Sequence, residues 1–126
     1  MSMRDYAFYE VGIMLNGLVH EDVLSELAED EVCESQFSFT GEAFPIRDDG
    51  TEDWGHGDSF ADMTVYYIAA PRHSTLFKAA YAHIYALVAD VLDAYRTARK
   101  SDGRLPALTT AQVRKRLRFI QGTYYG

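Results

Sequence analysis

Residues 33–43 (CESQFSFTGEA) and residues 60–70 (FADMTVYYIAA) are the stretches that decide the predicted fold. In the first, Phe37 and Phe39 alternate with polar side chains, which is typical of a strand with one buried and one solvated face. The second alternates in a similar way. A loop rich in glycine and acidic residues, RDDGTEDWGHGDS, occupies residues 47–59 between them. We therefore predict an antiparallel hairpin with this loop at its tip.

The flanking segments add one strand and three helices to this hairpin. They are a strand at 6–15 and helices at 21–31, 75–100 and 110–120. The strand ends at the turn signal Asn16-Gly17, and Thr109 and Gln112 have the spacing of a capping box before the last helix. The predicted order is β-α-β-β-α-α. This order predicts a single α+β domain over residues 1–126, with a three-stranded, mostly antiparallel sheet and the helices packed on one face.

Composition places the chain among ordinary globular proteins. It has 126 residues, of which 48% are hydrophobic and 25% charged. No window approaches the roughly 18 apolar residues of a membrane span, and the N-terminal residues do not have the pattern of a signal peptide. Cys33 is the only cysteine, so no disulfide can form within the chain. We expect a cytoplasmic protein that needs no cofactor and does not bind membranes.

The charged residues divide the chain into an acidic front and a basic back. Residues 1–70 contain two basic and sixteen acidic residues, whereas residues 71–126 contain ten basic and three acidic residues. The formal net charge is -7. An asymmetry of this kind concerns partners rather than fold. Either the two parts neutralise one another in the folded protein, or the acidic residues form a negative face.

A negative face would favour a non-enzymatic protein that docks on a basic surface of a protein partner. Inhibitors, immunity proteins and antitoxins of phages or mobile elements have this character, which is an analogy of class only. Trp54 is a candidate anchor within such an interface, because tryptophan is common at interface centres. The predicted partner-binding residues are Glu21, Asp22, Glu26, Glu29, Asp30, Asp48, Asp49, Asp53, Trp54 and Asp58.

Two alternative functions depend on other residues. The basic residues of the last predicted helix could bind the phosphates of a nucleic acid, which is the less favoured partner. They are Arg114, Lys115, Arg116 and Arg118. The loop and the strand after it could instead form a metal-binding module or the site of a metal-dependent hydrolase, because carboxylates and imidazole are metal ligands. Those candidate ligands are Asp49, Asp53, His56, Asp58 and Asp62.

Motifs of the common enzyme classes are missing from the sequence. It has no Gly-x-Ser-x-Gly segment, no phosphate-binding glycine loop and no His-Glu-x-x-His segment. An acidic neighbour, Glu34, would raise the pKa of the Cys33 thiol and make it less reactive. The apolar stripe of the 75–100 helix is compatible with a homodimer as well as with packing on a sheet. The sequence therefore favours a binding protein over an enzyme.

Overall fold

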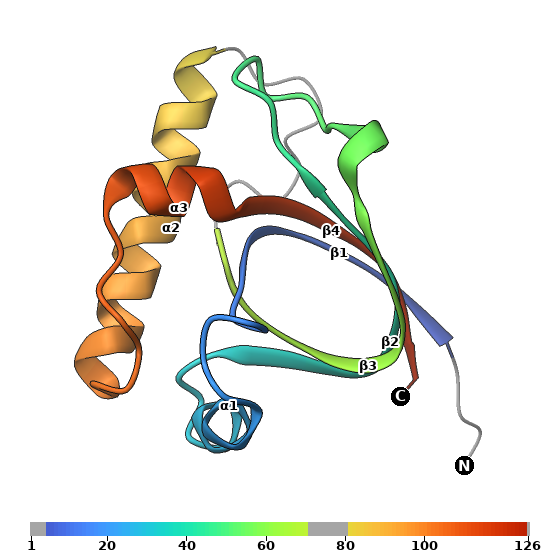
Figure 1. The fold of residues 1–126 in the computed structure, drawn as a ribbon, viewed down its shortest axis with the longest axis vertical. Helices are drawn as coiled ribbons and strands as arrows, with labels where there is room; N and C mark the ends of the chain where they lie inside the picture. The colour runs from blue at the N-terminus through green and yellow to red at the C-terminus, as the bar shows by residue number, and fades with distance from the viewer. Residues whose placement is uncertain (1–4, 71–80, 126) are drawn as a thin grey trace.

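The computed structural model describes residues 5–70 and 81–125, which form a closed antiparallel barrel with helices on its outside (Figure 1). The elements are β1 (Asp5–Met14), α1 (Glu21–Glu29), β2 (Glu34–Pro45), the 3-10 turn η1 (Trp54–His56), β3 (Asp58–Ala69), α2 (Tyr81–Ser101), α3 (Thr110–Arg116) and β4 (Leu117–Tyr125). Around the barrel the strands follow the order β1-β3-β2-β4. None of the described helices is both long enough and apolar enough to cross a membrane.

The last strand closes the barrel by pairing with two partners. β4 pairs with β1 from Asp5↔Tyr125 to Ile13↔Leu117, and with β2 from Thr40↔Thr123 to Pro45↔Arg118. The predicted hairpin is confirmed, because β2 and β3 are antiparallel from Glu34↔Tyr67 to Ala43↔Asp58. The join between β1 and β3 is much shorter and covers only Gly12↔Ala69 to Met14↔Tyr67.

The predicted three-stranded sheet and the β-α-β-β-α-α order are wrong. The structure is α+β, but residues 117–125 form a fourth strand, and the helix predicted over 110–120 stops at Arg116. The predicted capping box is present at its start, where the Thr109 side chain accepts from the Gln112 amide and the Gln112 side chain accepts from the Thr109 amide. A helix could bury only one side of this segment. As a strand, it buries Phe119 and Ile120 on opposite faces of the barrel wall and pairs its backbone with two neighbours.

Two apolar cores lie on either side of the barrel wall. The outer core joins alternate residues of the strands to the buried sides of α1, α2 and α3. Its large members include Val11, Ile13, Leu24, Leu27, Phe44, Ile68, Leu87, Val91, Tyr95, Val113 and Phe119. The inner core fills the barrel with Phe39, Ala43, Val65, Tyr67 and Ile120, against which Phe8, Met14, Phe60 and Met63 pack. The strands therefore bury side chains on both faces, which a flat sheet with one wet face would not do.

Irregularities in the strands let this small barrel close. Ser38 has a φ of 52°, and the β2–β3 register shifts between Gln36 and Phe39. This bulge breaks the predicted alternation, so Phe39 is fully buried while Phe37 is 63% exposed. At Gly41, a Cβ would lie 2.1 Å from the Gln121 carbonyl oxygen, so only glycine allows β2 and β4 to approach this closely.

The helices follow the predicted stripes with different bounds. In α1, Leu24 and Leu27 are buried, and the helix ends at Glu29, two residues before the predicted end. The His20 side chain caps it by accepting from the Asp22 amide at 3.2 Å. In α2, the predicted stripe is buried at Ile84, Val88, Val91 and Tyr95. The predicted beginning of this helix, residues 75–80, lies outside the described residues.

Candidate functional site

Seven acidic residues on α1 and just after it form a surface that we call the acidic end. Its members are Glu21, Asp22, Glu26, Glu29, Asp30, Glu31 and Glu34, and all seven are exposed. They reach solvent because the apolar stripe of α1, Leu24 and Leu27, points into the outer core and turns the rest of the short helix outward. Five of the predicted partner-binding residues therefore lie together.

Few cations neutralise the acidic end. Arg104 contacts Glu26, but it also pairs with Asp102 at 2.5 Å. His20 lies 3.6 Å from Asp22. Among residues 5–70 and 81–125, no other lysine, arginine or histidine lies within 4.0 Å of a carboxylate of this surface. Most of its negative charge is therefore left to solvent.

Two of these charges oppose the dipole of α1, whereas Glu21 and Asp22 lie in its first turn, where a negative charge is favourable. The last turn of α1 contains no basic residue, and Glu29 and the C-cap Asp30 stand where the helix dipole is negative. Each such carboxylate costs a few tenths of a kcal/mol. Packing of Leu24 and Leu27 must offset this cost, because the sequence supplies no compensating cation next to these residues.

Buried groups beside Glu34 show the effect of this negative charge. Burial raises the pKa of Glu10, and the carboxylate of Glu34 raises it further. The Cys33 thiol has its pKa raised to about 11, mainly by burial and then by Glu34. Burial also raises the pKa of Tyr67, whose hydroxyl accepts a hydrogen bond from Gln36 at 3.3 Å. The raised pKa of the Cys33 thiol agrees with the effect expected of Glu34, although burial is the larger cause.

The acidic residues of the 47–58 loop lie at the other end of the molecule (Figure 1), and each of three has a local partner. Asp48 accepts from Arg114 at 2.6 Å. Asp49 accepts from the amide and hydroxyl of Thr51, which lower the pKa of its carboxyl. Asp53 lies 2.9 Å from His56 and 3.4 Å from Arg47, and the bond to His56 is the main cause of its lowered pKa.

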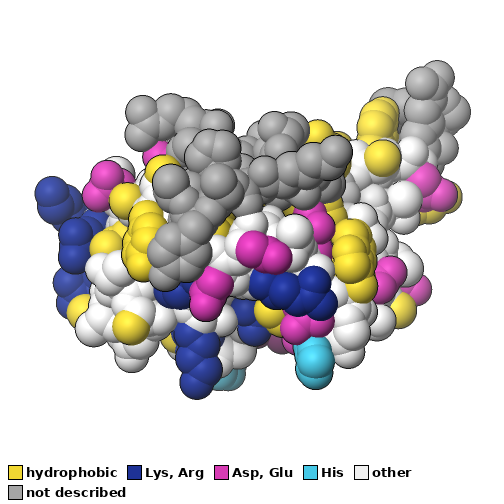
Figure 2. Space-filling view, turned by 90° about the horizontal axis from the view of Figure 1, so that it is seen from above, with side chains coloured by type: hydrophobic (Ala, Val, Ile, Leu, Met, Phe, Trp, Pro, Cys, Tyr) yellow, Lys and Arg dark blue, Asp and Glu magenta, His cyan; other side chains and the backbone are white. Residues whose placement is uncertain are grey.

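Figure 2 shows the end of the molecule that carries this loop. Basic, acidic and apolar side chains are intermixed over this face, and no large area has a single sign of charge. The ten predicted partner-binding residues therefore do not form one surface. Those on α1 remain together, whereas Asp48, Asp49 and Asp53 form ion pairs and hydrogen bonds with neighbours of their own.

Trp54 both packs on the barrel and stays accessible. Its ring centroid lies 4.5 Å from that of Phe44 and 6.2 Å from that of Phe119, which are nearly buried. The side chain is nevertheless 54% exposed. The indole thus folds onto the barrel and fixes η1 to it, while about half of its surface stays exposed.

The basic residues predicted for nucleic-acid binding are divided by the end of α3. Arg114 is paired with Asp48, and the Arg118 side chain donates to the carbonyls of Lys115 and Leu117 at 2.9 Å each. Arg118 belongs to β4 rather than to a helix. Lys115 and Arg116 are exposed, whereas Arg114 and Arg118 are half-buried, so the four residues do not form a continuous basic helix face.

The metal ligands predicted in and after the loop do not converge. Asp53 and His56 are in contact, but Asp49 bonds to Thr51 and Asp58 lies at the mouth of the barrel. Asp62 lies further along β3, where its amide donates to the Thr40 hydroxyl of β2 at 3.2 Å. In the described part of the chain, no three His, Cys, Asp or Glu side chains are arranged to hold a metal ion.

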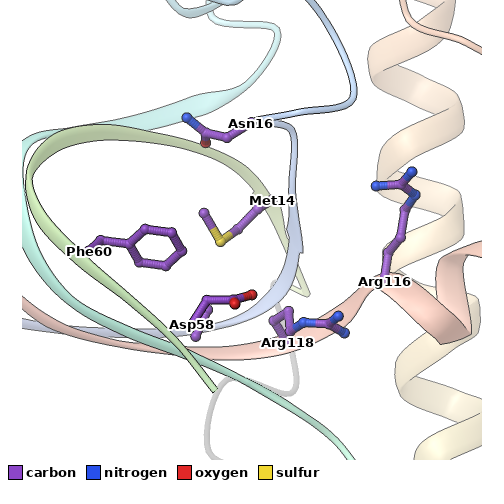
Figure 3. A pocket seen from close by; sticks show the side chains of 7 residues that line it. Met14, Asn16, Asp58, Phe60, Arg116 and Arg118 are labelled. Atoms are coloured by element: carbon purple, nitrogen blue, oxygen red, sulfur yellow. The ribbon is translucent and has the colours of Figure 1, made fainter. Parts of the chain in front are cut away.

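One small pocket opens at the mouth of the barrel, where β1, β2 and β3 meet the α3–β4 junction (Figure 3). Its volume is about 250 Å³, and its lining residues are Met14, Asn16, Ala43, Asp58, Phe60, Arg116 and Arg118. Sequence reasoning named Asp58, Arg116 and Arg118 but assigned them to different sites. They meet because β4 pairs with β2 and brings Arg118 beside Pro45. The sequence predicts a helix for Arg116 and Arg118, and so it does not predict this contact.

Comparison with known proteins gave no match. No family model matches the chain, and no curated protein or solved structure is similar to it at a significant level.

Proposed function

We propose that the protein is a non-enzymatic binding protein whose acidic end docks on a basic surface of a protein partner. The observation that supports this most is the uncompensated negative charge at the end of α1, at Glu29 and Asp30. Both side chains are exposed, and neither has a cation within 4.0 Å among the described residues. A charge that weakens its own helix is not explained by the stability of the fold, and docking on a basic partner would give it a role.

Electrostatic complementarity acts mainly on the rate and specificity of association. A surface of seven exposed carboxylates attracts a basic partner from a distance of about one Debye length, near 8 Å at physiological salt. Such a partner could be an enzyme or toxin with a cationic active site, which a bound acidic protein would cover. In this proposal the protein is an inhibitor or immunity-like protein, and its single buried thiol, Cys33, suits the cytoplasm.

The proposal is tested with poly-L-lysine as the immobilised probe of a basic surface. Glu29→Gln with Asp30→Asn removes two charges from the acidic end, and Glu42→Gln with Asp49→Asn removes two exposed charges elsewhere. We expect the first pair to weaken binding at least about fivefold and the second pair to have less than about a twofold effect. Raising the salt concentration should abolish the difference, because exposed charges are screened.

A photocrosslinking residue extends the test to the natural partner. Placed at Glu29, it should capture from the host extract a protein with an excess of Lys and Arg, and placed at Asp49 it should not. If the two double substitutions weaken binding to poly-L-lysine equally, net charge rather than the acidic end governs binding, and the proposal is rejected.

A further inference from the structure

The pocket at the barrel mouth concentrates positive charge in an acidic protein. Arg116 and Arg118 line it from the end of α3 and the start of β4, and Asp58 is the only carboxylate among the described residues that line it. Figure 3 shows Met14 in the middle, with Phe60 on one side and the two arginines on the other. The lining therefore has an excess of one positive charge.

The charged side chains that the structure describes in this pocket do not form ion pairs with one another. Within the described residues, neither Asp58 nor Arg116 takes part in an ion pair within 4.0 Å. Arg118 donates through one terminal nitrogen to the carbonyls of Lys115 and Leu117, which fixes its guanidinium and leaves its other nitrogens for a further acceptor. Burial lowers the pKa of Arg118, an effect that Asp58 opposes and Arg116 reinforces.

The remaining lining of the pocket is apolar or already satisfied. Met14 and Phe60 are partly buried and pack against the inner core, to which Ala43 belongs. Asn16 donates to the Thr64 carbonyl at 3.0 Å and accepts from the Tyr66 amide at 2.8 Å, so both ends of its amide have a partner and hold the side chain in the wall. A ligand would meet an apolar floor and two guanidinium groups at the rim.

We propose that the barrel mouth binds a small organic monoanion, a carboxylate with a short apolar body, with the carboxylate at Arg116 and Arg118 and the apolar body against Met14 and Phe60. Guanidinium groups bind carboxylates through paired, charge-assisted hydrogen bonds. The excess of one positive charge fits a monoanion, whereas the Asp58 carboxylate repels a dianion such as phosphate. The volume of about 250 Å³ is below that of a drug-sized site and suits a molecule of few heavy atoms.

The test observes the Met14 methyl group by NMR in methionine-labelled, full-length protein. Hexanoate should shift this signal in a saturable way, with a Kd at or below about 1 mM. The controls each remove one feature of the ligand: hexanol lacks the charge, hexylamine reverses it, and acetate lacks the apolar body. Each control, and inorganic phosphate, should bind at least about tenfold more weakly than hexanoate.

Substitutions test whether the carboxylate of hexanoate binds at Arg116. Arg116→Gln should weaken hexanoate binding at least about tenfold, whereas Lys115→Gln, the same change of charge one residue away, should leave the Kd within about twofold. Asp58→Asn should strengthen binding several-fold, because it removes a like charge. Absence of a Met14 shift at about 20 mM hexanoate, equal binding of hexanol, or equal losses for Arg116→Gln and Lys115→Gln would overturn the proposal.

Discussion

The acidic end and the 47–58 loop are the two most acidic regions of the chain, yet they differ in what surrounds their carboxylates. At the acidic end, Arg104 is the only arginine in contact with a carboxylate within the described residues. In the loop, Asp48 and Asp53 each contact an arginine. The comparison teaches that the number of acidic residues in a segment does not make a negative surface. The position of the nearest cations decides whether the charge is neutralised.

The difference is partly explained by where the basic residues lie in the sequence. No lysine or arginine occurs between Arg4 and Arg47, so α1 and the ends of its neighbouring strands have no basic residue nearby in sequence. The loop begins with Arg47 and is brought by the fold against Arg114 of α3. Three predictions test this contrast between a free and a neutralised acidic region.

The largest expected effect is the loss of the contact that fixes the loop. Trp54→Ala removes an indole that packs on Phe44 and Phe119 and should lower the free energy of unfolding by about 2 kcal/mol, less than for a fully buried tryptophan because Trp54 is 54% exposed. Urea denaturation measures it. Phe37→Ala, at a 63% exposed aromatic residue, is the control and should cost less than about 0.5 kcal/mol. If both variants lose the same stability, Trp54 does not fix the loop.

A smaller effect of opposite sign in the two regions follows from reversing one charge in each. Glu29→Lys places a cation at the negative end of the α1 dipole and should raise the free energy of unfolding by about 0.5–1 kcal/mol. Asp48→Lys brings a cation against Arg114 and should lower it by about 0.5 kcal/mol. Thermal unfolding at low salt gives both values. Changes of the same sign would contradict the contrast.

The smallest expected effect is a pH dependence at Glu10, which lies next to the acidic end. Its pKa in the folded protein is raised above the ordinary 4.5 by burial and by Glu34, so the folded state favours the protonated carboxyl. This contribution is fully present below the unfolded pKa and is lost as the pH rises through the folded pKa. Glu10→Gln should therefore be more stable than wild type at pH 7 and nearly equal to it below pH 4.5.

A substitution at Glu34 tests the cause of this pH dependence. Glu34→Gln should reduce the pH-dependent difference between wild type and Glu10→Gln, because one of the two causes of the raised pKa is then removed. Melting temperatures measured in steps across the acidic range give the comparison. A difference that does not change with pH would show that Glu10 keeps an ordinary pKa in the folded protein.

Local patterns carried most of the correct predictions. Alternation gave β1, β2 and β3, the Thr109–Gln112 spacing gave the cap of α3, and 3- and 4-residue spacing gave the buried stripe of α2. The failures came where a local pattern was ambiguous. Residues 117–125 follow a capped helix directly, and the Ser38 bulge reverses the alternation inside β2. Neither the strand at 117–125 nor the bulge at Ser38 can be predicted without knowing which strands pair with these segments.

The sequence by itself determined the alternation of the strands, the amphipathic helices and the long acidic stretch without a basic residue, because each depends on neighbours within a few positions. The hairpin followed because its two strands are consecutive in the chain. Only the tertiary structure decided that the sheet closes into a barrel, because closure needs β4 to pair with β1 and β2, which are far away along the chain. It also decided which acidic residues meet arginines. The pairing of Asp48 with Arg114 joins residues 66 positions apart, and Asp58 is similarly far along the chain from Arg116 and Arg118, so neither leaves a periodic pattern in the sequence.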